Sequence, residues 1–540
     1  MKRLYQSSAN LDKRAISKFL LSEEILMENA ANALASLISR ITHKKSVITI
    51  VCGSGDNGGD GYALARRLKG DYLVRVYEAK EPKSTLCKLQ AQRAQVCGVE
   101  WAKKILPCDV VVDCLFGSGF SGELDSAFIT LIRQMQSCAR VKIACDIPSG
   151  LDISNGFDTR VKEAFKADYT LSMGALKVGL FSDNAKDFVG EVLVGDLGIA
   201  SSEYEVQSPF FLLEKSDLAL PTRDKKAVHK GDFGHIVCVC GEKMGASILA
   251  CKAALTMGAG KASLLPAKCL STQESSDEND EADKTDKAKE NIESSKDLMV
   301  DFKLDSTQMR EIIATNPEIM LDFALPKSCV LVAGMGLGFC QSSTQKPTSR
   351  EKNASATINK NIQDAIKSAL KNCAFGLFDA DMCYAEVLRE ILEDSTLQSK
   401  VVLTPHPKEF ASLARICGIL QTTSQDASQN ADIEEVVANR FSLALKFSQN
   451  YPQATLLLKG ANTIIANGGK IYINPLGSQA LAKGGSGDVL CGVIAAFLAQ
   501  GFSPLDSAIN GSIAHALASH KEKNAYALTP LGLITHLGNL

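Results

Sequence analysis

Short runs of apolar, often β-branched residues alternate along this chain with longer segments whose apolar residues recur every three or four positions. In the first 200 residues this pattern predicts buried strands at 47–52, 110–115, 142–145 and 169–173. A helix is predicted before the first strand, with Ser22 as its N-cap, and another after it, over residues 62–68. Strands that alternate with helices are typical of a parallel sheet covered on both faces.

The pattern relaxes around residues 203–224 and then resumes, so we place a domain boundary near Pro221. Strands are predicted beyond it at 235–240, 263–265, 329–333, 376–379, 401–403, 454–458 and 463–466. The sequence therefore predicts an α/β protein of two domains. The first, residues 1–205, is expected to be a Rossmann-like three-layer parallel sheet, and the second to span residues 221–540.

Two segments of the second domain do not have the composition of a core. Residues 271–297 are polar, highly charged and nearly free of apolar side chains, and residues 341–357 are similar. Such segments bury too little apolar surface to offset the entropy of ordering them. We interpret both as insertions, mobile or helical at the surface; an acidic protein-binding segment is the alternative for the first.

Composition narrows the functional classes. The chain has 540 residues, of which 45% are hydrophobic and 22% charged, and its net charge of −2 gives no support for nucleic-acid binding. The beginning of the chain has no apolar signal-peptide region, and no apolar run reaches the roughly 18 residues of a spanning helix. The 17 cysteines form no CxxC pair and no zinc-like cluster with histidine. These features predict a soluble protein of a reducing cytoplasm.

The segment KGGSGDVLCG, at 483–492, carries the clearest chemistry. Its glycines, Gly484, Gly485 and Gly487, let the backbone approach an anion just before an apolar run that reads as a helix. The start of a helix offers free N–H groups and the positive end of the helix dipole, which together bind phosphate. Asp488 can take a proton from a hydroxyl that attacks the phosphate. This predicts phosphoryl transfer; a glycine-rich loop before a buried helix is the alternative.

Other predicted strands of the second domain also end in polar residues. Residues 459–463 (KGANT) offer partners for a nucleotide phosphate or base, or form a strand-ending turn. His406 lies between two prolines that fix the local backbone, which favours a ligand role over a packing role. Asp379 and Asp381 either orient water or magnesium or cap the next helix.

The first domain has its own polar strand ends. GSGDNGGDGY, at 53–62, follows a predicted strand, but its spacing is not the dinucleotide fingerprint, and a tight turn is the alternative. Asp113 ends another strand, and Asp146 and Ser149 follow a third. Because parallel strands end at one edge of a sheet, these loops can converge on a ligand crevice. Oxygen atoms of Asn57, Asp113 and Ser149 can hold a hard cation there.

Four motifs of the first domain occur in the order seen in NAD(P)H-hydrate epimerases: MENAA (27–31), GSGDNGGDGY, DCLFGSGFSGE (113–123) and DIPSGLD (146–152). The resemblance implies that Asn57, Asp113 and Ser149 ligate potassium and that Asp146 is catalytic. It implies that the hydrated nicotinamide nucleotide is lined by Asp56, Asn57, Gly58, Gly59, Asp60, Gly117, Ser118, Gly119, Phe120, Ser121, Gly122, Glu123 and Asp146. The chain has Asp56 where the family usually has asparagine, which adds a negative charge near a phosphate-bearing ligand.

The second domain resembles the ADP-dependent NAD(P)H-hydrate dehydratases of the ribokinase-like superfamily, and hence an α/β/α fold. The motifs are HKGDFGHIVCVCG (229–241), Gly245-Ala246, AGMGLG (333–338), DADM (379–382), LTPHPKEF (403–410), LKGANT (458–463) and GGSGDVL (484–490). The resemblance implies a hydrate site of Ala246, Gly336, Gly338, His406 and Asp488. It implies an adenine-nucleotide site of Lys459, Gly460, Ala461, Asn462, Thr463 and Gly487. Met335 stands where the family usually has proline.

Together the resemblances imply a homo-oligomeric repair enzyme for hydrated NADH and NADPH. Its first domain would interconvert the R and S hydrates with the help of K⁺. Its second would dehydrate the S form with ADP and Mg²⁺, releasing NAD(P)H, AMP and phosphate. Two alternatives stay open: a ribokinase-like kinase of a vitamin precursor such as a thiazole or pyrimidine alcohol, and a first domain that only binds nicotinamide nucleotides.

Overall fold

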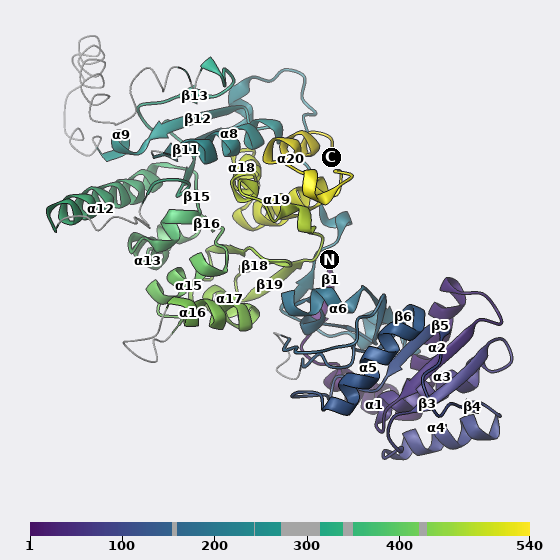
Figure 1. Cartoon of the computed structure of the whole chain (residues 1–540). Coiled ribbons are helices and arrows are strands. Elements are labelled where there is room, and N and C mark those ends of the chain that lie inside the picture. Colours follow the sequence, from purple (N-terminus) through teal and green to yellow (C-terminus); the bar gives the residue numbers. More distant parts are fainter. Residues whose placement is uncertain (154–158, 242, 272–310, 312–313, 339–348, 421–428) are drawn as a thin grey trace, which may run out of the picture. The chain divides into compact units, whose positions relative to one another are not determined.

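The computed structural model describes residues 1–153, 159–241, 243–271, 311, 314–338, 349–420 and 429–540 (Figure 1). Most of the predicted insertion 271–297 and residues 341–348 of the other lie outside these ranges, whereas residues 349–357 belong to helix α12 (Ser349–Asn372). The chain divides into two compact units, residues 1–212 with 438–442, and residues 213–437 with 443–540. None of the described helices is both long and apolar enough to cross a membrane.

The first unit is built on a seven-stranded sheet in the order β4-β3-β2-β5-β6-β7-β9, and all its neighbouring strands are parallel. The strands are β2 (Val47–Cys52), β3 (Leu73–Glu78), β4 (Glu100–Trp101), β5 (Cys108–Cys114), β6 (Ala139–Cys145), β7 (Tyr169–Met173) and β9 (Glu191–Gly195). The four predicted strands are confirmed. The prediction lacked β3, β4 and β9, which lie toward the edges of the sheet.

Side chains of this sheet alternate between two apolar cores. Ile48 and Ile50 of β2 face the larger core, and Val51 faces the smaller one. The larger core packs against helices α1 (Ala9–Phe19), α2 (Glu23–Ile41), α3 (Asp56–Leu68) and α4 (Thr85–Val96), and the smaller against α5 (Ser126–Cys138). The sheet is therefore covered on both faces.

The helix starts show how local sequence sets these elements. Ser22 caps α2 as predicted, with its hydroxyl accepting a hydrogen bond from the Ile25 amide at 3.3 Å. Helix α3 begins at Asp56, six residues before the predicted start at 62, so that prediction was wrong at its N-terminal end. A Cβ at Gly58 would lie 2.1 Å from the Gly53 carbonyl oxygen, and one at Gly59 would lie 2.7 Å from Met27. The glycines that suggested a loop are thus required for the helix to pack.

Short elements complete the first unit. They are β1 (Lys2–Tyr5), β8 (Leu176–Lys177), α6 (Lys186–Val189), α7 (Ser201–Tyr204) and β10 (Phe210–Leu212). Strand β1 pairs with both β8 and β10, which places Lys177 beside Tyr5 in the strand register.

The second unit holds strands in the order β13-β12-β11-β14-β15-β16-β17-β18-β19, parallel as far as β17 and antiparallel beyond it. They are β11 (His235–Cys240), β12 (Lys261–Pro266), β13 (Met320–Leu321), β14 (Val330–Ala333), β15 (Phe375–Phe378), β16 (Val401–Leu403), β17 (Thr455–Leu458), β18 (Thr463–Asn467) and β19 (Lys470–Asn474). All seven predicted strands are present, which confirms an α/β architecture in both units.

Helix α18 (Ser486–Ala499) is largely buried and follows the glycine-rich segment. It packs against α8 (Gly245–Thr256) so closely that a Cβ on Gly492 would lie 2.1 Å from the Ala250 carbonyl oxygen. The helices are α8 (Gly245–Thr256), α9 (Ala267–Ser271), α12, α13 (Val387–Glu393), α14 (Ser395–Gln398), α15 (Pro407–Ile416), α16 (Gln429–Ala438), α17 (Arg440–Asn450), α18 (Ser486–Ala499), α19 (Pro504–Ser519) and α20 (Pro530–Leu537). Close packing with α8 fixes where the first turn of α18 lies.

Each sheet reverses its strand order once. In the first unit β2 lies between β3 and β5, and in the second β11 lies between β12 and β14. Loops that leave the carboxyl ends of strands diverge at such a point and open a crevice for ligands. The polar motifs singled out in the sequence follow these strands and their neighbours.

Candidate active sites

In the first unit, a chain of hydrogen bonds joins the three residues predicted to hold a cation. The hydroxyl of Ser149 donates to Asp113 Oδ1 at 2.7 Å and accepts a hydrogen bond from the Phe116 amide at 3.1 Å. Asn57 Nδ2 donates to the Phe116 carbonyl oxygen at 2.9 Å, so the side-chain oxygen of Asn57 points away from that carbonyl. The first turn of α3 and the loops after β5 and β6 therefore meet here.

Asp113 is fully buried at this meeting point. Burial raises the pKa of its carboxyl to about 6, although the hydroxyl and amide of Ser149 and the Leu115 amide all donate to it and lower the pKa. The cluster offers one carboxylate with amide, hydroxyl and carbonyl oxygens. In the described part of the chain no three His, Cys, Asp or Glu residues are grouped as for a transition metal. Such a donor set fits a hard cation of low charge.

The glycine-rich turn before α3 leaves the first amides of that helix without a side-chain cap. Asp56 is exposed, and its carboxylate accepts a hydrogen bond from the Ser84 hydroxyl at 2.6 Å. No lysine or arginine of the described residues forms an ion pair with Asp56. The added negative charge therefore stands at the N-terminus of α3, where the Ser84 hydroxyl donates to it.

Asp146 lies at the end of β6 in the left-handed backbone region, with φ of 69°. Lys177 Nζ donates to its Oδ1 at 2.6 Å, and the Met173 amide donates to the same oxygen at 3.1 Å. Lys177 is entirely buried, and its ammonium also donates to the Ser172 hydroxyl at 3.1 Å. Non-glycine residues held at positive φ cluster at functional sites, which is consistent with a role for Asp146.

The structure places the other predicted residues of this unit around the same edge of the sheet. Burial, followed by the charge of Asp146, raises the pKa of Asp60 well above its usual value. The predicted loop of residues 117–123 follows β5 and is mostly exposed; Gly122 donates to Asp152 at 2.8 Å, and Glu123 pairs with Lys162 at 3.0 Å. Asp60 therefore lies near Asp146, whereas Glu123 faces solvent.

In the second unit, the loops after β15 and β17 are joined by an ion pair. Lys459 Nζ lies 2.7 Å from Asp379 Oδ1, and the Cys491 thiol donates to Asp379 Oδ2 at 3.2 Å. Burial alone would lower the pKa of Lys459, but the negative partners around it, Asp379 first, outweigh burial and raise that pKa. The Asp379 side chain therefore pairs with Lys459 and does not cap the next helix, and both of its oxygens accept hydrogen bonds.

The N-terminus of α18 opens onto this ammonium. Gly485 has φ of 89° and provides no side-chain cap, and a Cβ on Gly487 would lie 3.2 Å from Lys459 Nζ. Asp488 lies half-buried in the first turn. Burial and the charge of Asp379 raise its pKa, while Lys459 lowers it. Free amides, a cation and a carboxylate of raised pKa thus occur together. The amides and the cation can bind an anion, and the carboxylate can accept a proton beside it.

Two further loops reach the same edge of the second sheet. The glycines of the loop after β14 have positive φ, 72° at Gly336 and 84° at Gly338, and the Gly338 amide donates to Asp381 at 2.7 Å. Asp381 thus fastens this loop and does not cap a helix. Ala246 lies in the first turn of α8, after β11, and Asn462 is buried before β18.

His406 is the N-cap of α15 and forms a capping box with Glu409. Glu409 Oε2 accepts from the His406 amide at 2.8 Å, and Oε1 lies 3.1 Å from His406 Nε2. Burial and the charge of Asp379 raise the pKa of Glu409 to about 7. Burial lowers the pKa of His406, and the positive charge of Lys459 lowers it further. The histidine thus tends to be neutral while its ring remains exposed.

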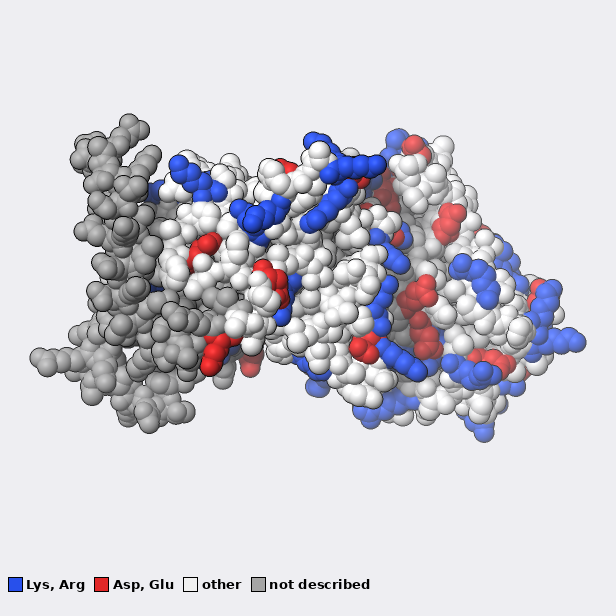
Figure 2. Space-filling model, turned by 90° about the horizontal axis from the view of Figure 1, so that it is seen from above, with Lys and Arg blue, Asp and Glu red and all other residues white. Residues whose placement is uncertain are grey.

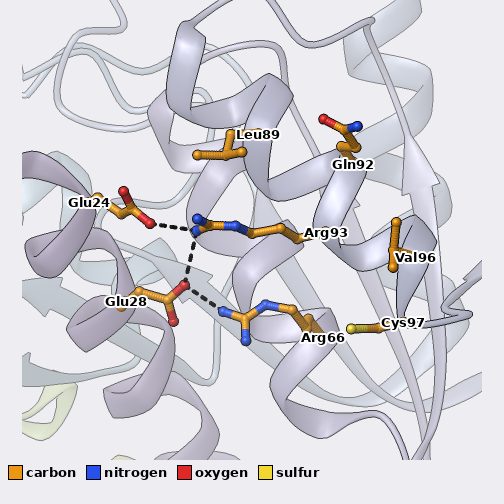
Figure 3. Close-up of a pocket in the computed structure, with 8 residues that line it drawn as sticks. All are labelled: Glu24, Glu28, Arg66, Leu89, Gln92, Arg93, Val96 and Cys97. Atoms are coloured by element: carbon orange, nitrogen blue, oxygen red, sulfur yellow. Dashed lines mark hydrogen bonds and ion pairs between the residues drawn. The ribbon is translucent and has the colours of Figure 1, made fainter.

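An open groove of about 630 Å³ on α2, α3 and α4 lies elsewhere (Figure 3). Its two arginines already pair with glutamates: Arg93 with Glu24 at 2.6 Å and Arg66 with Glu28 at 2.5 Å. None of the predicted site residues lines it. On the face shown in Figure 2, basic side chains are interspersed with acidic ones, as the near-neutral net charge predicts.

Sequence reasoning missed Lys177, Glu409 and Cys491. Lys177 was visible as a lysine inside the otherwise apolar run of residues 173–181, and Glu409 as an acid two residues after a helix-starting proline. Nothing in the sequence marks Cys491, which lies one turn into an apolar helix.

Comparison with known proteins gives family matches for both units. A model described as YjeF-related protein N-terminus matches residues 23–179, and one described as NAD(P)H-hydrate dehydratase matches residues 235–537. The bifunctional NAD(P)H-hydrate repair enzyme of Helicobacter pylori is 42% identical over 100% of both chains. That of Dictyoglomus turgidum is 29% identical over 97% of this chain and 95% of its own.

Solved structures give a weaker likeness. The ADP/ATP-dependent NAD(P)H-hydrate dehydratase of Bacillus subtilis, co-crystallised with ATP and Mg²⁺, is 21% identical to this chain. The match covers 59% of this chain and 92% of that one, with a TM-score of 0.38. A superposition this loose carries no information about ligands.

Proposed function

The chain belongs to the family of bifunctional NAD(P)H-hydrate repair enzymes, and from this premise we propose how its residues divide the work. The protein is an NAD(P)H-hydrate epimerase and an NAD(P)H-hydrate dehydratase in one chain. For the dehydratase, the observation that carries the assignment of catalytic roles is the ion pair of Lys459 and Asp379 at the open N-terminus of α18.

The dehydratase reaction must remove a hydroxyl from the ring carbon beside the ring nitrogen. We propose that this hydroxyl attacks the β-phosphorus of ADP, that AMP leaves, and that Asp488 takes the hydroxyl proton. The ring nitrogen then expels phosphate, and loss of a proton from the neighbouring carbon restores NADH or NADPH. Hydroxide is a poor leaving group and phosphate a good one, which explains the use of a nucleotide.

Lys459 and the amides around Gly487 would hold the negative charge of the transferring phosphoryl group. His406, Ala246, Gly336 and Gly338 are proposed to hold the hydrate, and residues 460–463 the rest of the adenine nucleotide. The ammonium of Lys459 already neutralises the charge of Asp379, so this carboxylate does not fit a resident divalent metal. Magnesium stays a prediction that accompanies the nucleotide.

For the epimerase we propose that Asp146 takes the proton of the ring hydroxyl as the bond from that carbon to the ring nitrogen opens. The nitrogen gains a proton and the hydroxyl carbon becomes an aldehyde, which recloses on its other face to give the opposite epimer. Asp60, the first turn of α3 and residues 117–123 would line the nucleotide. Asn57, Asp113 and Ser149 fit a potassium ion by their oxygen chemistry, and a bound ion would supply a fixed positive charge beside the substrate. A cytoplasmic location and a homo-oligomer stay predictions.

The test uses the purified full-length chain with a mixture of both NADH-hydrate epimers, ADP and magnesium, and follows the absorbance of reduced nicotinamide. We expect recovery of NADH from both epimers. Recovery of the S share alone, with the R share lost only at the spontaneous rate, would contradict the epimerase role. A stable phosphorylated product without NADH would instead indicate a kinase.

A further inference from the structure

Lys177 is a buried lysine that the proposed mechanism does not use. Its side chain has no exposed surface, yet among the described residues its ammonium has only two partners, Asp146 Oδ1 at 2.6 Å and the Ser172 hydroxyl at 3.1 Å. A buried ammonium is costly unless it is paired and hydrogen-bonded. A lysine buried in this way calls for a functional explanation.

The geometry gives the two oxygens of Asp146 different surroundings. Oδ1 accepts from Lys177 Nζ and from the Met173 amide, whereas Oδ2 accepts from no group of the described residues and is not enclosed. The backbone is held as well, because the Asp146 amide donates to the Leu171 carbonyl oxygen at 2.9 Å while φ stays at 69°. The residue therefore presents one carboxylate oxygen in a fixed direction.

Other titratable groups surround this carboxylate. The groups that interact electrostatically with it are Asp60 of α3, Asp12 of α1, Cys145, which precedes it in sequence, and Tyr204 of α7. Burial raises the pKa of both aspartates, so each carries less negative charge than a free carboxyl. Lys177 is thus the cation that directly contacts Asp146 among the described residues.

We propose that Lys177 is a positioning residue of the epimerase, which holds Oδ1 of Asp146 and so aims its Oδ2 at the ring hydroxyl of the hydrate. This inference rests on the proposed role of Asp146. The bound substrate would then contact Oδ2 of a carboxylate whose orientation Lys177 fixes through Oδ1. Lys177 itself would not contact the substrate.

The experiment measures interconversion of the R and S hydrates by chromatography, without nucleotide, in the full-length chain. Lys177→Met should lower kcat at neutral pH about 100-fold and change KM less than about threefold. The acid limb of the kcat profile should move upward, because the carboxylate loses the cation beside it. Lys177→Gln keeps a donor without the charge and should shift the limb in the same way.

Lys142→Met is the matched control, because it breaks a lysine–aspartate pair of the same unit, with Asp168 at 3.1 Å, away from Asp146. It should leave the pH profile unchanged. In Asp146→Asn, adding Lys177→Met should cost nothing further. If Asp146→Asn keeps full turnover, the role of Asp146 itself is wrong. If that variant is inactive but the Lys177 variants keep the native profile, or simply unfold, Lys177 is structural and the inference is overturned.

Discussion

Lys459 and Asp379 face each other across strand β16, with 2.7 Å between ammonium and carboxylate, and so join the loops that follow β17 and β15. Only 4% of the Asp379 side chain is exposed. Removing one member of a buried ion pair leaves the other uncompensated, which costs about 3–5 kcal/mol. The same lysine lies against Gly487, so the pair links the stability of the second unit to its chemistry.

Lys459→Met should therefore impair both properties. We expect dehydratase turnover to fall at least about 100-fold, because the phosphoryl charge loses its cation. The free energy of unfolding of the second unit should fall by about 3 kcal/mol. Steady-state dehydration of the S hydrate and a denaturant melt give the two numbers, and epimerase activity of the same sample serves as control. Unchanged turnover would remove Lys459 from the nucleotide site.

Gly487→Ala probes the helix terminus without changing a charge. The new Cβ would lie 3.2 Å from Lys459 Nζ and 3.7 Å from its Cε, so the lysine must shift. We expect KM for ADP to rise about tenfold, equivalent to roughly 1.4 kcal/mol of binding free energy. The measurement is the ADP dependence of NADH recovery, with the melting temperature as a check on the fold. An unchanged KM would mean that the nucleotide does not approach this turn.

The raised pKa of Glu409 predicts a dependence of stability on pH. The folded pKa of Glu409 is about 7, above its ordinary 4.5, so the folded state binds the extra proton between these values. Stability of the second unit should fall as pH rises from about 4.5 to 7. The depressed pKa of His406 acts in the opposite direction near pH 6.5, weakly because its side chain is 46% exposed.

Glu409→Gln should flatten this fall, as measured by denaturant melts at pH 5, 6 and 7. The amide keeps the hydrogen bond from the His406 backbone but cannot ionise. Glu393→Gln, which removes an exposed partner of Arg389, is the control and should leave the slope unchanged. A wild-type slope in Glu409→Gln would contradict the raised pKa of Glu409.

Ser149→Ala should make the epimerase less responsive to potassium. The Ser149 hydroxyl both donates to Asp113 and accepts from the Phe116 amide, so its loss loosens the whole oxygen cluster. We expect the K⁺ concentration for half-maximal epimerase turnover to rise about tenfold. Titration of KCl against a constant total of KCl and choline chloride measures it. Equal turnover of the wild type without K⁺ would refute the cation site.

Asp56→Asn restores the residue that is usual in the family and removes a charge. Because Asp56 is exposed and its carboxylate accepts from the Ser84 hydroxyl, asparagine can keep that hydrogen bond through its amide oxygen. KM of the epimerase for the hydrate should fall, by up to about fivefold for one screened charge near a phosphate. Asp71→Asn is the control, since Asp71 pairs with Lys44 at the surface. A higher KM in Asp56→Asn would show that the carboxylate binds substrate.

The central strands of both sheets were predictable because they are buried on both faces and read as continuous apolar runs, as in 47–52 and 235–240. Strand β3 alternates buried and more exposed residues, LVRVYE, and so lacks that mark. The start of α3 was missed because glycine is a poor helix former, while close packing against Gly53 and Met27 overrides that propensity.

The candidate sites divide in the same way. Loops at the ends of parallel strands follow from topology alone, so the neighbourhoods of Asp146, Ser149 and Lys459 could be predicted, and the glycine-rich start of a helix marked Asp488. Partners that come from elements distant in the sequence could not be predicted. Lys177 reaches Asp146 from 31 residues away, and Cys491 reaches Asp379 from 112. Such pairs depend on how three-dimensional packing orients side chains, which no local pattern records.

The two units each contain a run of parallel strands with its own reversal of strand order, yet one polypeptide carries both. Every molecule that a cell makes therefore brings one epimerase and one dehydratase, whatever the level of expression. A cell cannot remove S hydrate while lacking the means to convert R hydrate, except through a lesion that strikes one unit alone. A copy that has lost the epimerase unit would leave R hydrate to convert only at the spontaneous rate. A copy that has lost the dehydratase unit would leave both isomers, so the isomers left behind would identify the unit that was lost.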